Sequence, residues 1–317
     1  MEPKKYSPFQ KHAEYDKIPG QDPFEQRKIL KERPNIPDLK FGKIIGHGNF
    51  SHVYEGFYKN DKAAIKVIER GSPRYISNEI EINEELRNIP HIPTLLNVFY
   101  EPQTIMVFEF VDTIPINNYF ETITLPQIRT ILRCTLEALS EAHKHGIVHR
   151  DVKIGNILVK SDFSDVFLID WGSGAFISDS LTSKAGSRSS RSPEMLLGYR
   201  NYKSLCDIWA IGILILHFLT NGSIPWKARS SRESICLMSR FYGRRSIEEL
   251  ANNLNLKAPS SLADCPSEPV ANLESEFKTK NPNLNDANLI DLMKQCLSLD
   301  PKRRPTAKLA LSHPFFV

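Results

Sequence analysis

The sequence lacks features that would assign it to several specialised classes of protein. Its five cysteines form no CxxC pair and no metal-like cluster, which suits a reducing compartment, and we interpret them as packing residues. The longest apolar run, residues 208–219, is too short to span a bilayer and predicts a buried helix. A net charge of +4 over 317 residues is too mild to indicate nucleic-acid binding. We therefore expect neither a membrane nor a nucleic acid as a direct partner.

The N-terminal residues are polar and contain no apolar core, so we expect no secretory signal and a protein of the nucleus, the cytoplasm or both. Residues 1–37 carry six prolines and no steady periodicity, which predicts an extended arm. Composition leaves open whether this arm is a disordered tail or a segment that docks on the rest of the chain and keeps it active. Residues 38–317 are long enough for a substantial core.

The chain is organised around residues 149–156, which read HRDVKIGN, and residues 170–172, which read DWG. Short apolar segments on both sides of the first motif and just before the second predict strands that frame a loop. Such a loop would present a carboxylate, an ammonium group, a carboxamide and a second carboxylate. Phosphoryl transfer needs this kind of set, because the protein mainly positions groups and neutralises charge.

Each of these four side chains has a predicted role. Asp151 would orient the attacking hydroxyl and accept its proton, and Lys153 would lie near the transferred phosphate. Asn156 and Asp170 would bind Mg²⁺ through oxygen atoms. The motif HRD alone would be expected by chance, but HRDxKxxN followed by an apolar strand and DWG is a specific signal.

With these motifs the sequence resembles the eukaryotic protein kinases over residues 38–317. The resemblance implies an α+β fold of two lobes, with a small antiparallel sheet and one main helix in residues 38–110 and a mainly helical lobe in residues 111–317. It also implies ATP and Mg²⁺ as cofactors. A pseudokinase, which keeps the fold without catalysis, is the alternative from a different functional class. The presence of every residue of the catalytic set argues against it.

A glycine-rich segment, residues 46–53, lies between two predicted strands and would bring backbone N–H groups close to phosphates. Lys66 is a charge within an apolar strand and needs a partner. The family places that partner on the following helix, predicted over residues 75–88, where Glu79 is favoured and Glu81 is the second choice. The resemblance implies these ATP-binding residues: Ile45, Gly46, His47, Gly48, Asn49, Phe50, Ser51, His52, Val53, Ala64, Lys66, Glu79, Glu109, Val111 and Leu158.

The segment from residue 170 to residue 194 corresponds to the activation segment of the family. It ends in SPE, and the resemblance implies that Glu194 pairs with Arg304 far downstream. Asp207 matches the residue of a buried helix that braces the backbone of the HRD motif. Ser187 matches the position whose hydroxyl bridges the catalytic aspartate and lysine in serine/threonine kinases, which makes serine or threonine the expected acceptor.

Arg188 and Arg191 follow Ser187, where the substrate residue after the acceptor would pass. Guanidinium groups at this place would favour protein substrates with acidic or phosphorylated neighbours. They could also pair with a phosphorylated loop residue or remain solvated. We interpret them as substrate-recognition residues.

Two branches of the family share these traits. Ser51, the DWG motif and residues 78–96 resemble the casein kinase 2 catalytic subunits, which are constitutively active. Residues 185–188, 224–228 and 241–248 resemble the cell-division-cycle kinases that fire replication origins and use a regulatory activator subunit. We favour the origin-firing branch because its stretch after the main apolar helix is the more distinctive. The long inserts typical of that branch are absent from this sequence.

Overall fold

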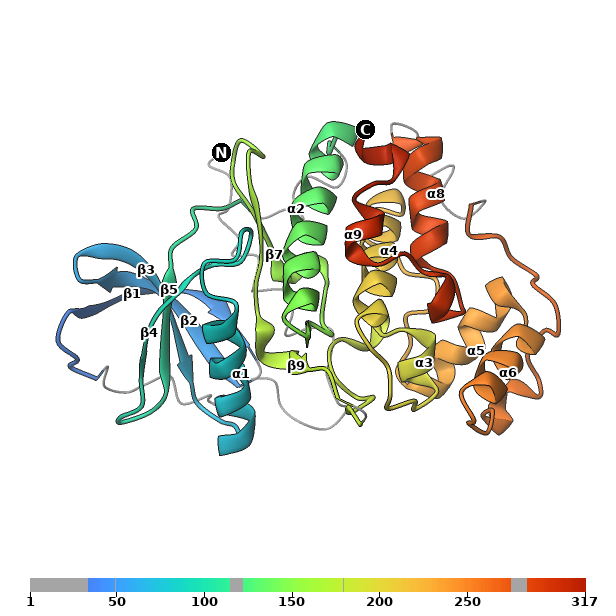
Figure 1. The fold of residues 1–317 in the computed structure, drawn as a ribbon, viewed down its shortest axis with the longest axis horizontal. Helices are drawn as coiled ribbons and strands as arrows, with labels where there is room; N and C mark the ends of the chain where they lie inside the picture. Colours follow the sequence, from blue (N-terminus) through green and yellow to red (C-terminus); the bar gives the residue numbers. More distant parts are fainter. Residues whose placement is uncertain (1–33, 49, 115–121, 179, 275–283) are drawn as a thin grey trace, which may run out of the picture.

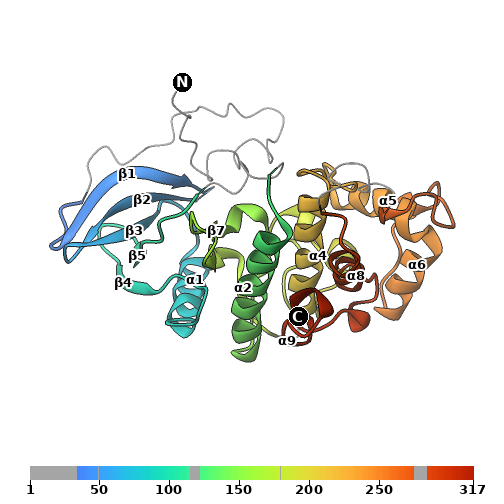
Figure 2. The ribbon, with the colours of Figure 1, turned by 90° about the horizontal axis from the view of Figure 1, so that it is seen from above.

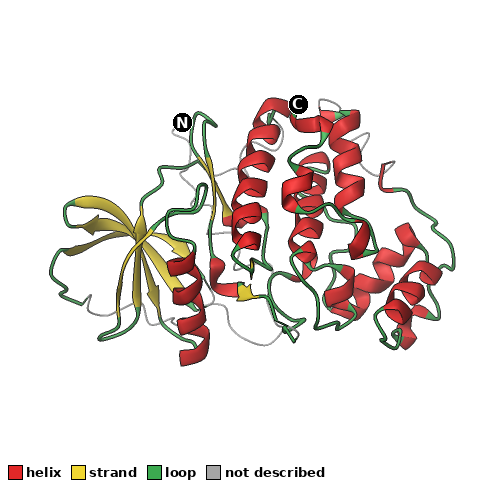
Figure 3. Ribbon diagram, in the orientation of Figure 1, coloured by secondary structure: helices red, strands yellow, loops and turns green. Residues whose placement is uncertain are grey.

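The computed structural model describes residues 34–48, 50–114, 122–178, 180–274 and 284–317. The predicted arm therefore lies largely outside the described residues, and its boundary near residue 37 stays a prediction. Strands gather at one end of the molecule and helices at the other (Figure 3). This is the expected α+β fold of two lobes.

The N-lobe is a five-stranded antiparallel sheet in the order β1-β2-β3-β5-β4. Its strands are β1 (Leu39–His47), β2 (Ser51–Tyr58), β3 (Asp61–Ile68), β4 (Leu95–Phe99) and β5 (Ile105–Glu109). Inward side chains such as Tyr54, Ile65 and Val107 are fully buried in a core of their own. Along β3 the buried side chains of Ala63, Ile65 and Val67 alternate with the half-buried Ala64 and Lys66, so one face of the strand lies in this core.

Helix α1 (Pro73–Glu85) lies between the sheet and the C-lobe (Figures 1 and 2). Its start is encoded locally, because Ser72 caps the backbone N–H of Tyr75 and Pro73 occupies the first turn. The helix is shorter than the predicted range 75–88 at its C-terminal end. Residues 86–88 leave the helix in a turn, where Asn88 has a positive φ of 64°.

The C-lobe is built on helices α2 (Leu125–Lys144) and α4 (Leu205–Leu219) (Figure 1). Thr124 and Gln127 form a capping box at the start of α2. Nearly every side chain of α4 is buried, as its continuous apolar sequence predicts. The remaining helices are α3 (Pro193–Leu196), α5 (Ser231–Tyr242), α6 (Arg244–Asn253), α8 (Ala287–Cys296) and α9 (Ala307–Ala310).

Two small two-stranded antiparallel sheets lie where the lobes meet. Strands β7 (Ile157–Val159) and β8 (Val166–Leu168) form one, and β6 (Ile147–Val148) pairs with β9 (Ala175–Phe176). These short strands frame the two polar motifs at the predicted positions. None of the helices in the described ranges has both the length and the apolar character needed to cross a bilayer.

Candidate active site

The backbone of the HRD motif is held in place by a buried carboxylate. Asp207 of α4 is fully buried and accepts hydrogen bonds from the backbone N–H of His149 at 2.9 Å and of Arg150 at 2.7 Å. Burial alone would raise the pKa of Asp207, but the hydrogen bond and charge of His143 hold it below its ordinary value. The loop therefore rests on an ionised group inside the core, as the sequence predicted.

Asp151, Lys153 and Ser187 form a closed network. Lys153 Nζ lies 2.7 Å from Asp151 Oδ2 and donates to Ser187 Oγ at 2.9 Å. The backbone N–H of Ser187 donates to Asp151 Oδ1 at 2.7 Å. The activation segment is thus joined to both catalytic-loop side chains, and a hydroxyl approaching Asp151 would meet an oriented carboxylate beside an ammonium group.

Asn156 faces the same carboxylate. Its amide nitrogen donates to the Asp151 carbonyl at 2.8 Å and to Asp151 Oδ2 at 3.2 Å. Because the nitrogen is directed toward Asp151, Oδ1 is the ligand atom that Asn156 can offer to a metal. A carboxamide oxygen together with the oxygens of Asp170 is a donor set that suits Mg²⁺.

Asp170 follows β8 with a left-handed backbone, φ 64° and ψ 67°, which a residue other than glycine adopts only when its surroundings hold it there. The next residue, Trp171, is buried and packs edge-on against the ring of His149. Burial lowers the pKa of His149, so the ring is neutral, with Nε2 donating to the Ile169 carbonyl and Nδ1 accepting from Asp151. The two motifs are thereby locked together.

Lys66 of β3 binds two carboxylates. Its Nζ lies 2.5 Å from Glu79 Oε1 and 3.1 Å from Asp170 Oδ1. Glu79 is 3% exposed, whereas Glu81 faces solvent, so the structure contains the favoured pair and not the second choice. The pair joins the sheet to α1 and to the DWG motif.

Interactions between the charged groups determine the protonation states of Lys66 and Asp170. Burial would lower the pKa of Lys66, but Asp170 and Glu79 raise it above its ordinary value. The ammonium group of Lys66, whose Nζ is 3.1 Å from Asp170 Oδ1, in turn lowers the pKa of the half-exposed Asp170 carboxyl to about 2. Asp170 is therefore a carboxylate at neutral pH, the form that can bind Mg²⁺.

Two close contacts at glycines, one in this cluster and one in the activation segment, were not apparent from the sequence. A Cβ added at Gly172 would lie 3.0 Å from the Tyr75 hydroxyl and 3.1 Å from Glu79 Oε2, so a larger residue there would have to displace one of these two side chains. Tyr75 thus covers the ion pair from α1, and nothing in its local sequence distinguished it. At Gly186, φ is +67° and a Cβ would lie 2.0 Å from the Arg150 carbonyl, so only glycine fits.

The glycine-rich segment forms a tight turn between β1 and β2, with His47 opposite His52 and Gly46 opposite Val53. Ile45 precedes the turn in β1, and within the turn the N–H of Gly48 donates to the Ser51 carbonyl at 2.8 Å. Phe50 is 53% exposed and its ring lies 6.4 Å from that of Tyr75. The His52 ring is buried, with Nδ1 2.6 Å from Glu69 Oε1, and Asn49 lies outside the described residues.

The segment after β5 links the lobes. The backbone N–H of Glu109 donates to the Thr94 carbonyl at 3.0 Å, so a contact with adenine would fall to its carbonyl oxygen. Glu109 and Val111 line a cavity of about 430 Å³ together with residues of the β7–β8 turn. Val53, Ala64 and Leu158 are half-buried and do not line that cavity.

The two substrate-recognition candidates lie differently. Arg188 donates one long hydrogen bond, 3.4 Å, to the Ala228 carbonyl. Arg191 donates to three carbonyls of its own segment, those of Lys184, Ala185 and Gly186, at 2.6 to 2.8 Å. The structure therefore engages Arg191 in holding the activation segment, which sequence spacing did not reveal, and leaves Arg188 as the weaker-bound cation of the two.

Arg150 also holds this segment. Its guanidinium donates to the carbonyls of Ser173 at 2.6 Å and Gly174 at 3.0 Å and lies 3.3 Å from the Tyr202 hydroxyl. The segment ends at Glu194, whose carboxylate receives two 2.8 Å hydrogen bonds from Arg304. Both side chains are buried, and this is the predicted long-range pair.

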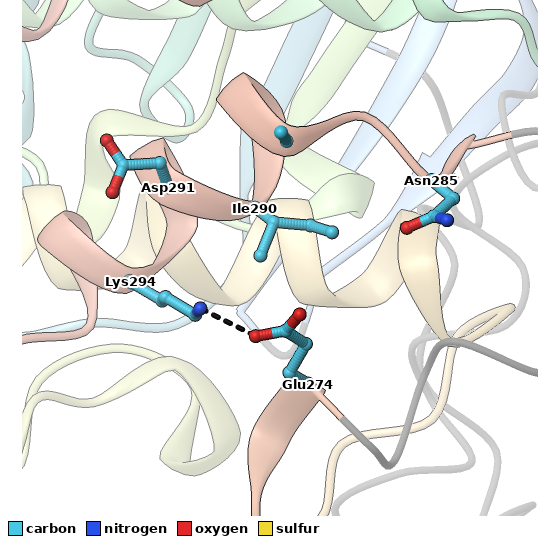
Figure 4. Close-up of a pocket in the computed structure, with 6 residues that line it drawn as sticks. Glu274, Asn285, Ile290, Asp291 and Lys294 are labelled. Atoms are coloured by element: carbon cyan, nitrogen blue, oxygen red, sulfur yellow. Dashed lines mark hydrogen bonds and ion pairs between the residues drawn. The ribbon is translucent and has the colours of Figure 1, made fainter.

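A second cavity, of about 420 Å³, lies beside α8 and away from these motifs (Figure 4). Its lining is polar, and Lys294 and Glu274 form an ion pair at 2.7 Å across one side of it. An exposed pair of this kind contributes little energy and reads as surface structure. We assign no site there.

A comparison with protein-family models agrees with this geometry. The family described as "Protein kinase domain" matches residues 39–316. The chain belongs to the protein kinase domain family, whose members transfer phosphate from ATP to proteins.

Proposed function

We propose that the chain is a serine/threonine protein kinase that transfers the γ-phosphate of ATP, with Mg²⁺, to sites with acidic or phosphorylated neighbours. The observation that carries the choice of acceptor is the hydrogen bond from Lys153 to Ser187 Oγ. Through it the hydroxyl of Ser187 is joined to Lys153 and to Asp151, which is the contact that the resemblance implies for serine/threonine kinases. The sites of ATP and Mg²⁺ would be formed by the residues described above.

In this reaction the side chains mainly position the reacting groups and neutralise charge. Lys66 would bind the α- and β-phosphates while Glu79 holds the ammonium group in place. Asn156 and Asp170 would hold Mg²⁺, which neutralises charge on the phosphates when it is bound. Asp151 orients the substrate hydroxyl and takes its proton, and Lys153 offsets the charge on the transferred group.

The preference for acidic substrates is proposed from Arg188. Its guanidinium has a single long hydrogen bond and lies one residue from Ser187, so it can turn toward a carboxylate or phosphate at little cost. Arg191 instead would support the preference indirectly, by keeping the segment in shape.

We further propose a role in cell division and the initiation of DNA replication, with a nuclear location and a regulatory activator subunit. These proposals are supported by the resemblance of residues 185–188, 224–228 and 241–248 to the origin-firing branch. The casein kinase 2-like branch, active without a partner, is the alternative.

The test is phosphorylation of a positional peptide library with Mg-ATP, by the chain alone and with a candidate activator subunit. Activity that requires the activator, on serine followed directly by an acid or phosphoserine, supports the proposal. Activity of the chain alone on peptides with acids several residues downstream supports the casein kinase 2-like alternative. Phosphorylation of tyrosine peptides instead would refute the choice of acceptor.

Arg188→Ala should reduce the preference for an acid next to the acceptor by about tenfold, since a hydrogen bond to a charged group contributes about 1.5 kcal/mol. Turnover of a neutral peptide should be unchanged. Arg245→Ala is the matched control, because Arg245 is an exposed arginine on α6 paired with Glu268. An Arg188→Ala profile identical to that of the control would contradict the assignment.

A further inference from the structure

Three side chains with metal-binding atoms converge near the junction of the lobes. They are His91 in the turn before β4, Cys134 on α2 and Asp165 just before β8. One ligand atom of each lies within 4.8 Å of the other two, the only such group of three that the described part of the chain contains. His91 Nδ1 is 2.9 Å from Asp165 Oδ1, and Cys134 is 6% exposed.

The His91 ring is held in one orientation. Its backbone has a φ of 63°, and the second ring nitrogen, Nε2, lies 2.9 Å from Glu137 Oε2, one turn along α2 from Cys134. A histidine that binds a metal through one nitrogen nearly always gives the other N–H to a carboxylate or carbonyl. Glu137 already provides that partner, with Nδ1 left facing Asp165 Oδ1.

We propose that His91, Cys134 and Asp165 bind one Zn²⁺ ion, with a water molecule as the fourth ligand and Glu137 as the carboxylate behind His91. Bonds of about 2.0 to 2.3 Å at tetrahedral angles separate such ligand atoms by roughly 3.3 to 3.7 Å. A cluster already within 4.8 Å reaches that geometry through small side-chain movements. A sulfur and an imidazole among the ligands favour Zn²⁺ over Mg²⁺ or Ca²⁺.

The replacement of two protons by one Zn²⁺ ion leaves the charge of the cluster unchanged. Both His91 nitrogens face carboxylate oxygens at 2.9 Å, so without a metal both carry protons. Zn²⁺ replaces the Nδ1 proton and the Cys134 thiol proton, and both are released to solvent. The net charge of the cluster is the same before and after, with Lys160 at 3.5 Å from Asp165 remaining as the neighbouring cation.

The zinc site would connect the turn before β4, helix α2 and the start of β8. The carbonyl of His91 accepts the N–H of Leu168 at 2.8 Å, and Leu168 ends the strand that leads to Asp170. Zinc binding would therefore fix the turn after α1 to α2 and to this strand.

The test is a Zn²⁺ titration of the whole chain after treatment with a chelator, with stoichiometry and unfolding temperature as readouts. We expect one zinc per chain, an unfolding temperature that rises with the logarithm of free zinc, and a thiolate charge-transfer band when Co²⁺ is bound instead. Cys134→Ala should abolish binding. Cys296→Ala, which changes another buried cysteine, on α8, should leave it intact.

Glu137→Gln should weaken zinc binding by about 10- to 100-fold while leaving the stoichiometry at one. Asp165→Asn provides a second loss-of-binding variant if Cys134→Ala does not fold. Absence of stoichiometric binding to the wild-type chain at micromolar zinc would overturn the proposal. So would binding without a Co²⁺–thiolate band, or binding that persists in both Cys134→Ala and Asp165→Asn.

Discussion

Removal of the Arg304 side chain tests how the activation segment is anchored. The guanidinium is fully buried, donates twice to Glu194, and also bonds to the carbonyls of Ser298, Leu205 and Leu299 at 2.9 to 3.3 Å. Its charge lies 5.1 Å from the centre of the Trp209 ring. Arg304→Met keeps most of the volume but leaves the Glu194 carboxylate and three carbonyls without their donor.

Breaking a buried pair by removing one partner costs about 3 to 5 kcal/mol, because the remaining charge stays buried. With an unfolding entropy of about 2.1 cal/mol/K per residue, a chain of 317 residues shifts its unfolding midpoint by about 1.5 °C for each kcal/mol, which gives a fall of roughly 4 to 8 °C. Urea unfolding of the variant, followed by tryptophan fluorescence, measures the free energy directly.

Arg303→Met is the matched control. Arg303 is the preceding residue, its side chain is 82% exposed, and its contact with Asp300 is a loose 3.9 Å. That change should cost less than about 1 kcal/mol. The double variant Glu194→Gln with Arg304→Met should recover part of the loss, because the stranded charge is gone. An Arg304→Met chain as stable as the control would refute this account of the anchor.

Two further predictions concern the Lys66 cluster. Lys66→Met should abolish phosphotransfer from ATP in a peptide assay while circular dichroism stays that of the wild type, and residual wild-type activity would contradict the site assignment. The pKa of Asp170 is lowered to about 2 from 3.8, so the stabilisation it provides is complete above about pH 4 and is lost as the pH falls toward 2. Acid unfolding of Asp170→Asn should therefore be flatter than that of the wild type over this range, and parallel curves would show that Asp170 is not the titrating group.

Several features could be predicted from the sequence because the resemblance to the kinase family implies which residues they bring together. The strands around the HRD and DWG motifs, the support of the HRD backbone by Asp207 and the pair of Glu194 with Arg304 lie as predicted. Helical spacing could not separate Glu79 from Glu81, because the choice depends on how α1 faces β3, and burial of Glu79 decided it.

Other features depend on contacts between distant segments that no local pattern encodes. Arg191 was interpreted from its distance along the chain to Ser187, but the activation segment curls so that three carbonyls surround its guanidinium. Tyr75 reaches Gly172, and His91 meets Asp165, only because α1 and the turn after it pack against the C-lobe. Cys134 packs in the core as the sequence predicted, and its approach to His91 and Asp165 is a further contact between distant segments.

The contacts of Arg150 have a consequence for control by phosphate. The Arg150 guanidinium already donates to two carbonyls and lies near the hydroxyl of Tyr202, which itself donates to the Thr182 carbonyl at 2.6 Å. A phosphate added to the activation segment would compete for an occupied site instead of ordering a loose one. It would have to displace those carbonyls and leave them in need of new donors. In such an arrangement phosphorylation would rearrange an activation segment that is already ordered. The free-energy cost of that rearrangement is set by the hydrogen bonds that it breaks.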